Sequence, residues 1–337
     1  MTDKLFKMAA IQAAPIHFDV AASLEKACGL IAEAGRMGAD IAAFGETWLP
    51  GYPIWCYGQH SPLFFEAHAA YLEASITIPG PETDVLCQAA AAAGMDVSIG
   101  VVEKEPATNG SVYCTLLFIS REGQILGRHR KLLATHRERI PWANGDGAGL
   151  VAYQRSYARI SGLNCFEHFM MLPGFALAEQ GTQVHVAAWP GREPPAPPPA
   201  PMTLWPRQLL MSRAFAAQAG SYVILAGGIN RKQDVPEKFR DLVLFEHSGD
   251  SCIIDPTGEV IAGPAEGETI LIAEGSLDMV RAAKASIDIA GHYSRPDILK
   301  LSVDRSKREF TPHLCASEDG EVDEPVSYLA LNDLAGV

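Results

Sequence analysis

Short apolar runs alternate with helical patterns along most of this 337-residue chain, and this alternation limits the folds open to it. The runs 39–45 (ADIAAFG) and 182–189 (TQVHVAAW) have the length and composition of buried strands. In segments such as 20–37, apolar residues instead recur with the spacing of a helix face. The chain is therefore expected to form an α/β fold in which helices cover a sheet.

The same patterns predict the order of the elements. Strands are expected at 5–16, 39–45, 96–103, 157–164, 182–189, 221–229 and 269–274. Helices are expected at 20–37, 62–75, 82–94, 166–180, 206–219 and 276–285. Hairpins are expected at 111–131 and 251–262, so the sheet should be mixed and not purely parallel. No composition break marks a second domain, and we expect one domain at 1–303 with an extension at 304–337 that is flexible or contacts another subunit.

Composition and charge exclude several classes of protein. The formal charge of −13 disfavours nucleic acid and anionic membranes as partners. No apolar run is long enough to cross a bilayer, and Gln12 interrupts the apolar stretch at the N-terminus, so a signal peptide is not expected. The seven cysteines are scattered without a CxxC pair, which disfavours a zinc site and favours a reducing compartment. These features predict a cytoplasmic enzyme.

A proline-rich segment, 190–206, interrupts the alternation. Such a run favours polyproline II and cannot join a sheet. It is either a docking peptide or loop over a site, or a stiff surface connection. Composition alone favours the connection by about three to one.

Cys165 follows a strand-like segment and precedes a helical one. The unpaired N–H groups at a helix N-terminus lower the pKa of a nearby thiol and can hold developing negative charge. A buried structural cysteine is the other interpretation, and placement at the turn leaves the two about equally weighted.

Glu46 ends an apolar strand, beside Trp48 and Tyr52. Sites in α/β proteins lie at the carboxyl ends of strands. A partly desolvated carboxylate there should have a raised pKa, in the range useful for a general base. Taken alone, Glu46 is more simply an N-cap or a surface residue.

Lys131 ends the second strand of the first predicted hairpin, after a run of basic residues. Such a run is usually a solvated strand edge. A lysine at a strand end can instead reach into a pocket and stabilise an anionic intermediate. Together, Glu46, Lys131 and Cys165 supply a base, a cation and a thiol, a set that suits addition to a carbon–nitrogen bond.

The contexts of these three residues resemble the nitrilase superfamily of carbon–nitrogen hydrolases. The similarity runs from AAIQAAP near the start to GHYSRPDILKLSVDR at 291–305. Its most specific stretches are FGETWLPGYP, HRKLLATHRERIPWANGDG and GLNCFEHFMMLPGFALAEQGTQVHVAAWP. The sequence CFEH at 165–168 resembles the true nitrilase branch, aliphatic- or arylacetonitrilase-like, because the amidase and carbamoylase branches usually have aspartate two places after the cysteine.

The resemblance implies a role for each residue and an architecture. Glu46 is implied as the base, Lys131 as the cationic stabiliser and Cys165 as the nucleophile, while Glu138 matches a second glutamate that positions the lysine and the substrate. The fold it implies is a four-layer α-β-β-α sandwich that forms homo-oligomers, as dimers or larger spirals. It implies no metal or organic cofactor.

The sequence departs from the family pattern at a few positions. Ala134 stands where proline is usual, Phe166 where tryptophan is commoner, and the proline-rich stretch 191–201 is unusual. These departures bear on substrate choice and leave the catalytic groups intact. Candidate substrate-binding residues next to the motifs are Tyr52, Trp55, His129, Phe166, His168 and Trp189. For Trp55 and Trp189, a place in the core is about equally weighted.

We therefore expect a nitrilase that converts an organic nitrile, aryl or arylalkyl or else aliphatic, to the carboxylic acid and ammonia. A cyanide hydratase or dihydratase has nearly the same motifs. An amidase and a catalytically inactive scaffold are the more distant alternatives. A cysteine–histidine hydrolase would need a histidine partner, and His168 is too close to Cys165 along the chain for that role.

Overall fold

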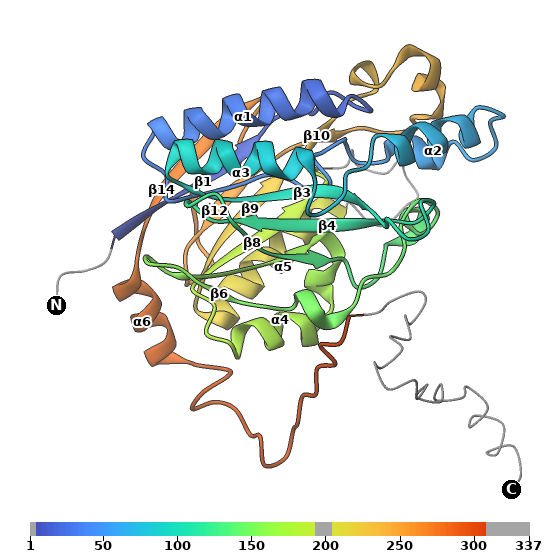
Figure 1. Cartoon of the computed structure of the whole chain (residues 1–337). Helices are drawn as coiled ribbons and strands as arrows, with labels where there is room; N and C mark the ends of the chain where they lie inside the picture. Colours follow the sequence, from blue (N-terminus) through green and yellow to red (C-terminus); the bar gives the residue numbers. More distant parts are fainter. Residues whose placement is uncertain (1–4, 193–203, 308–337) are drawn as a thin grey trace, which may run out of the picture. The chain divides into compact units, whose positions relative to one another are not determined.

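A computed structural model describes residues 5–192 and 204–307 (Figure 1). It contains two six-stranded sheets, of order β14-β1-β2-β3-β4-β5 and β13-β12-β9-β8-β7-β6. In each sheet three neighbouring strands are parallel, β1 to β3 in the first and β7 to β9 in the second, and the flanking strands are antiparallel. Both sheets are mixed, as predicted, and they share one strand arrangement.

The first sheet comprises β1 (Leu5–Gln12), β2 (Ile41–Ala43), β3 (Asp96–Lys104), β4 (Val112–Ile119), β5 (Ile125–Arg130) and β14 (Thr269–Ser276). The second comprises β6 (Tyr153–Gln154), β7 (Arg159–Asn164), β8 (Val184–Trp189), β9 (Tyr222–Gly227), β12 (Cys252–Ile254) and β13 (Val260–Ala262). A separate pair is formed by β10 (Ile229–Asn230) and β11 (His247–Ser248).

The α-helices are α1 (Val20–Arg36), α2 (Phe64–Glu73), α3 (Pro81–Ala93), α4 (Met171–Ala178), α5 (Leu204–Ala219) and α6 (Leu277–Ser286). Short 3-10 helices cover Ile54–Tyr57, His136–Arg139, Gly147–Gly149, Cys165–Phe169, Lys232–Asp234 and Glu237–Leu242. No helix in the described ranges is both long and apolar enough to cross a membrane.

The alternation of side chains along β1 shows how the layers form. Ala9 and Ile11 pack against α1 and α3, whereas Phe6, Met8 and Ala10 pack against the second sheet. On the far face of the second sheet, side chains of β8, β9 and β12 pack against α5. Residues 5–192 and 204–306 therefore form the four layers α-β-β-α that the sequence resemblance implies (Figure 1).

The predicted helix at 166–180 is wrong in one respect. The structure divides it into a 3-10 helix, Cys165–Phe169, and α4, with Met170 in an extended conformation between them. Pro173 explains the break, because it lacks an N–H and its ring would collide with the carbonyl of Phe169 in a continuous helix. Most of the proline-rich segment (193–203) and of the predicted C-terminal extension (308–337) lies outside the described residues.

Candidate active site

Strand ends from both sheets meet around Glu46. This residue follows β2, and its backbone N–H donates to the carbonyl of Trp189, the last residue of β8, at 3.1 Å. A Cβ on Gly45 would lie 2.8 Å from the backbone nitrogen of Gly228 and 2.9 Å from the Trp189 oxygen. Glycine is therefore required where the two sheets come this close.

Three of the predicted catalytic residues form a buried ionic cluster. Nζ of Lys131 lies 2.7 Å from Oε1 of Glu46 and 2.6 Å from Oε2 of Glu138. The Tyr52 hydroxyl donates to Oε1 of Glu138 at 2.6 Å, and the Thr135 N–H donates to Oε2 at 2.7 Å. Each carboxylate is thus held by the ammonium, and Glu138 is fixed further by two neutral donors.

The ammonium keeps its charge in this environment. Burial alone would lower the pKa of Lys131, but attraction to Glu138 and Glu46 raises it well above its usual value. Lys131 is only 1% exposed, so the basic run before it is not simply a solvated strand edge. A fixed, desolvated cation of this kind can stabilise negative charge that develops beside it.

Cys165 joins the cluster from the second sheet. Its sulfur and one carboxylate oxygen each of Glu46 and Glu138 lie within 4.8 Å of one another. Cys165 has a φ of +48°, in the left-handed region that a residue with a side chain rarely adopts. In the part of the chain that the structure describes, Oε2 of Glu46 has no hydrogen-bond partner, so it can accept a proton.

The expected lowering of the thiol pKa is wrong. Burial raises the pKa of Cys165 well above its usual value, and the nearby Glu46 carboxylate raises it further. The helix that begins at Cys165 is a 3-10 helix of only five residues, which offers a much weaker dipole than a long α-helix. At rest the thiol is therefore protonated, and the site needs a base to activate it.

Glu46 is suited to be that base. Burial, the largest effect, and the nearby Glu138 together raise its pKa to about 7 against the lowering influence of Lys131. The expected raised pKa is therefore confirmed. Cys114 on β4 also donates its thiol hydrogen to Oε1 of Glu46 at 3.4 Å, a contact that the sequence did not predict.

Glu167 ties the loop of the thiol to the loop of the lysine. Its two carboxylate oxygens lie 3.0 Å from Nε2 of His129, and they accept from the N–H groups of Leu132 at 2.9 Å and Asn164 at 2.8 Å. Burial alone would raise the pKa of Glu167, but His129 and these N–H groups bring it below its usual value. Leu132 and Asn164 are the chain neighbours of Lys131 and Cys165, so one carboxylate spaces the two catalytic loops.

The same cluster meets the distance requirement for a metal site through Glu46, Glu138 and Cys165. Lys131, however, already places a cation in contact with both carboxylates. The protein itself therefore supplies a cation between the two carboxylates.

The predicted substrate-binding residues divide into two groups. Tyr52, Phe166 and His168 lie at the cluster: Tyr52 contacts Glu138, and the other two lie in the 3-10 helix that begins with Cys165. Trp189 is fully buried beside them, and its ring contacts Phe166 and His168.

Two of the predicted substrate-binding residues have other places. Trp55 packs in a hydrophobic cluster, with ring contacts to Phe18, Phe64, His68 and Tyr71. His129 is fully buried and contacts Glu167, so it supports the loops. Among the described residues, no contact is seen between the Cys165 thiol and the side chain of Trp55 or His129.

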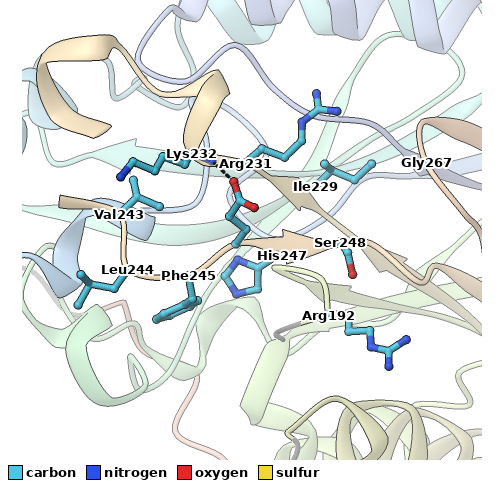
Figure 2. A pocket seen from close by; sticks show the side chains of 11 residues that line it. Arg192, Ile229, Arg231, Lys232, Val243, Leu244, Phe245, His247, Ser248 and Gly267 are labelled. Atoms are coloured by element: carbon cyan, nitrogen blue, oxygen red, sulfur yellow. Dashed lines mark hydrogen bonds between the residues drawn. The ribbon is translucent and has the colours of Figure 1, made fainter. Parts of the chain in front are cut away.

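A cavity of about 910 Å³ lies around the β10–β11 pair (Figure 2). Its lining consists of Arg192, Ile229, Arg231, Lys232, Val243, Leu244, Phe245, Glu246, His247, Ser248 and Gly267. The His247 ring lies edge-on against Tyr52, with the ring centroids 5.1 Å apart. His247 therefore both lines the cavity and contacts Tyr52, the hydrogen-bond partner of Glu138. The sequence did not predict this cavity, because its lining lies mostly in loops without periodicity.

Comparison with known families adds to this geometry. The model of the carbon-nitrogen hydrolase family matches residues 7–285. Nitrilase 2 from an unknown prokaryotic organism is 53% identical over 315 residues, covering 93% of this chain and 96% of that protein. An aliphatic nitrilase from Rhodococcus rhodochrous is 36% identical, covering 91% and 84%. An arylacetonitrilase from Fusarium vanettenii is 32% identical, covering 90% and 94%.

Solved structures share the architecture. Nit3 from Saccharomyces cerevisiae, a member of the nitrilase superfamily, superposes with a TM-score of 0.68 at 18% identity, covering 86% of this chain and 97% of that one. At this identity the similarity concerns the fold.

Proposed function

The chain belongs to the carbon-nitrogen hydrolase family, and we propose that within it the protein is a nitrilase that converts an organic nitrile to the carboxylic acid and ammonia. The observation that carries the proposal is that the Cys165 thiol, the Glu46 carboxylate with its raised pKa and the charged Lys131 lie close together in one buried cluster. We assign Cys165 as the nucleophile, Glu46 as the base and Lys131 as the cationic stabiliser. Glu138, held by Tyr52, positions Lys131.

The first half of the reaction forms a thioimidate. Glu46 takes the proton of the Cys165 thiol, and the sulfur attacks the nitrile carbon. One carbon–nitrogen π bond breaks, and the nitrogen receives the proton from Glu46. Lys131 stabilises the negative charge that develops on nitrogen during the attack.

The second half releases the products. A water molecule, deprotonated by Glu46, adds to the thioimidate carbon; both hydrogens of this water pass to the nitrogen, which leaves as ammonia, and a thioester remains. A second water adds in the same way, and the carbon–sulfur bond breaks to give the acid and the free thiol. Two waters are consumed for each nitrile. If the first tetrahedral intermediate instead expels the sulfur, an amide is released.

For the substrate we propose an aryl or arylalkyl nitrile. Phe166 and Trp189 lie in the same hydrophobic cluster as Cys165 and supply aromatic surface there. The names of the relatives include both an aliphatic nitrilase and an arylacetonitrilase, so aliphatic nitriles are the alternative class. Cyanide and small amides are the alternative substrates for this type of site.

The test is ammonia release from a panel of phenylacetonitrile, benzonitrile, an aliphatic dinitrile, cyanide and phenylacetamide. Release from phenylacetonitrile should exceed that from the dinitrile, and Cys165→Ala should abolish it. Cys28 is a half-buried free thiol on α1, so Cys28→Ala is the matched control and should keep the activity. Activity on cyanide or amide alone would replace the proposal by one of those alternatives, and inactivity of folded protein on every compound would favour a non-catalytic scaffold.

We also propose that the protein is a homo-oligomer. Four consecutive apolar side chains are exposed from the end of the 3-10 helix into the first residues of α4: Phe169 (38%), Met170 (39%), Met171 (84%) and Leu172 (65%). Exposed apolar patches commonly mark protein interfaces. Met171→Lys should lower the sedimentation coefficient of the assembly. Met37 is an exposed methionine just after α1, and Met37→Lys should leave the coefficient unchanged.

Two further proposals concern organisation and location. We propose that 1–303 is the hydrolase domain and 304–337 an extension; Val303 packs against the Leu150 cluster, and Arg305, at the start of the extension, donates to the Leu150 carbonyl. A chain ending at 303 should keep the activity.

A cytoplasmic location is supported by the six described cysteines, all of which are free thiols. Alkylation of protein denatured directly from cells should modify them without a reductant.

A further inference from the structure

A chain of buried polar side chains leads from the nucleophile into the second sheet. Nδ1 of His168 lies 2.8 Å from the carbonyl oxygen of Cys165, and Nε2 of His168 lies 3.1 Å from Nε2 of His185 on β8. Nδ1 of His185 lies 2.9 Å from Oγ of Ser161 on β7. The reaction steps above use none of these polar groups, so the chain needs its own explanation.

The chemistry of the groups fixes the direction of each hydrogen bond. A carbonyl oxygen can only accept, so Nδ1 of His168 must carry the hydrogen. Burial lowers the pKa of His168 to about 4 and that of His185 well below its usual value, so both rings are neutral near pH 7 and carry one hydrogen each. Nε2 of His168 therefore accepts, Nε2 of His185 donates, and Nδ1 of His185 accepts the hydrogen of the Ser161 hydroxyl.

Stacking fixes the planes of both rings. The His168 ring stacks on Trp189, with centroids 5.2 Å apart and planes at 26°. The His185 ring stacks on Phe215, with centroids 4.0 Å apart and planes at 27°. The two imidazoles thus have defined positions as well as defined hydrogens.

The carbonyl at the end of this chain belongs to a peptide that matters for the nucleophile. The Cys165 carbonyl and the Phe166 N–H form one planar unit and point in opposite directions. That N–H acts on the Cys165 thiol as a backbone donor that lowers its pKa, against the larger raising effect of burial. Because Cys165 has an unfavourable φ of +48°, the peptide needs an outside contact to keep this orientation.

We propose that His168 and His185 are positioning residues for the nucleophile. His185, oriented by Ser161, holds His168 in its Nδ1–H tautomer, and His168 holds the Cys165–Phe166 peptide with its N–H toward the sulfur. The N–H then stabilises the thiolate when Glu46 removes the proton. This inference rests on the proposed function, because the direction of the N–H matters only if Cys165 is the nucleophile.

Reciprocal substitutions test the proposal. Asparagine places its amide near the position of histidine Nδ1, and glutamine places it near Nε2. His168→Asn therefore keeps a donor for the Cys165 carbonyl, whereas His168→Gln loses it. At position 185 the order reverses, because His185→Gln keeps the donor toward His168 and His185→Asn loses it.

The expected result is opposite preferences at the two positions. With phenylacetonitrile, His168→Gln and His185→Asn should lower kcat about 100-fold with little change in KM, the loss typical when one stabilising donor is misplaced. His168→Asn and His185→Gln should stay within about tenfold of the unmodified enzyme. His60→Gln, an exposed histidine, is the control. If both positions prefer the same amide, or if no variant loses activity, the histidines only fill space and the proposal is wrong.

A second measurement needs no variant. Nitrogen-15 NMR of histidine-labelled, unmodified protein at pH 7.5 should show the Nδ1–H tautomer for His168 and the Nε2–H tautomer for His185. The opposite tautomer or a charged ring at either position overturns the inference, even where a variant fails to fold. Nitrile hydrolysis without the reciprocal pattern overturns the inference alone, whereas an unmodified protein inactive on every nitrile overturns the proposed function together with it.

Discussion

Replacing Glu167 with glutamine should separate the two catalytic loops without removing any group that reacts. The carboxylate accepts from His129, Leu132 and Asn164, all inside the protein. In glutamine one of the two oxygens becomes an NH₂ group. Whichever way the amide turns, that NH₂ faces a backbone N–H that has lost its acceptor.

The magnitude follows from these contacts. A buried hydrogen bond to a charged acceptor contributes about 1.5–3 kcal/mol, and an orphaned buried donor adds its own cost. Glu167→Gln should therefore lower the free energy of unfolding by roughly 3 kcal/mol. Because the loops carry Lys131 and Cys165, kcat should fall at least about tenfold, as each 1.36 kcal/mol of lost transition-state stabilisation costs a factor of ten.

The assay combines urea unfolding with initial rates on the best nitrile of the panel. Glu179→Gln is the matched control, since Glu179 is an exposed glutamate at the end of α4. An ordinary surface substitution changes the free energy of unfolding by about 0.5 kcal/mol or less. If Glu167→Gln stays within that range of the unmodified protein and keeps its kcat, then Glu167 does not space the loops.

Three other perturbations test the site. Burial raises the pKa of Glu46 to about 7, and a general base must be deprotonated to act. The kcat should therefore fall about tenfold per pH unit below pH 7 and level off above it. A kcat that stays unchanged down to pH 5 would exclude Glu46 as the base. Tyr52→Phe removes the 2.6 Å bond to Glu138 and should lower kcat roughly tenfold, the cost of one charge-assisted bond, in steady-state kinetics; unchanged kcat would show that Glu138 needs no such support. His168, whose pKa burial lowers to about 4, binds a proton more readily in the unfolded chain between pH 6.5 and 4, so its contribution to stability is lost as pH falls through that window. From pH 7 to pH 5 the unmodified protein should lose about 2 kcal/mol more stability than His168→Asn in urea titrations, and equal losses would contradict a buried neutral ring.

Local pattern was sufficient to predict most of the fold. The alternation of apolar runs predicted strands and helices close to their observed positions, and it placed Glu46, Lys131 and Cys165 at strand ends. Resemblance to a family then supplied Glu138. The four side chains come from separate elements, and the structure brings them together; their roles stay proposals.

What the sequence did not predict depends on neighbours across the sheets. The thiol pKa of Cys165 is set by burial against Glu46, which lies 119 positions earlier in the chain (165 minus 46) and in the other sheet. Periodicity shows which side of a strand is buried but not which side chain it meets there. For the same reason, Trp55 was a candidate for the pocket but lies in the core, and the partner of His168 on β8 went unnoticed.

The shared strand arrangement of the two sheets has a consequence for how activity appears during folding. Glu46 and Lys131 extend from the first sheet and Cys165 from the second, so neither sheet alone contains a working site. The last strand, β14, returns to pair with β1 along eight residues, from Leu5–Ser276 to Gln12–Thr269, and so closes the first sheet only after the second has been synthesised. Recovered turnover therefore reports the docking of two halves, and it should lag behind the return of secondary structure when the chain refolds.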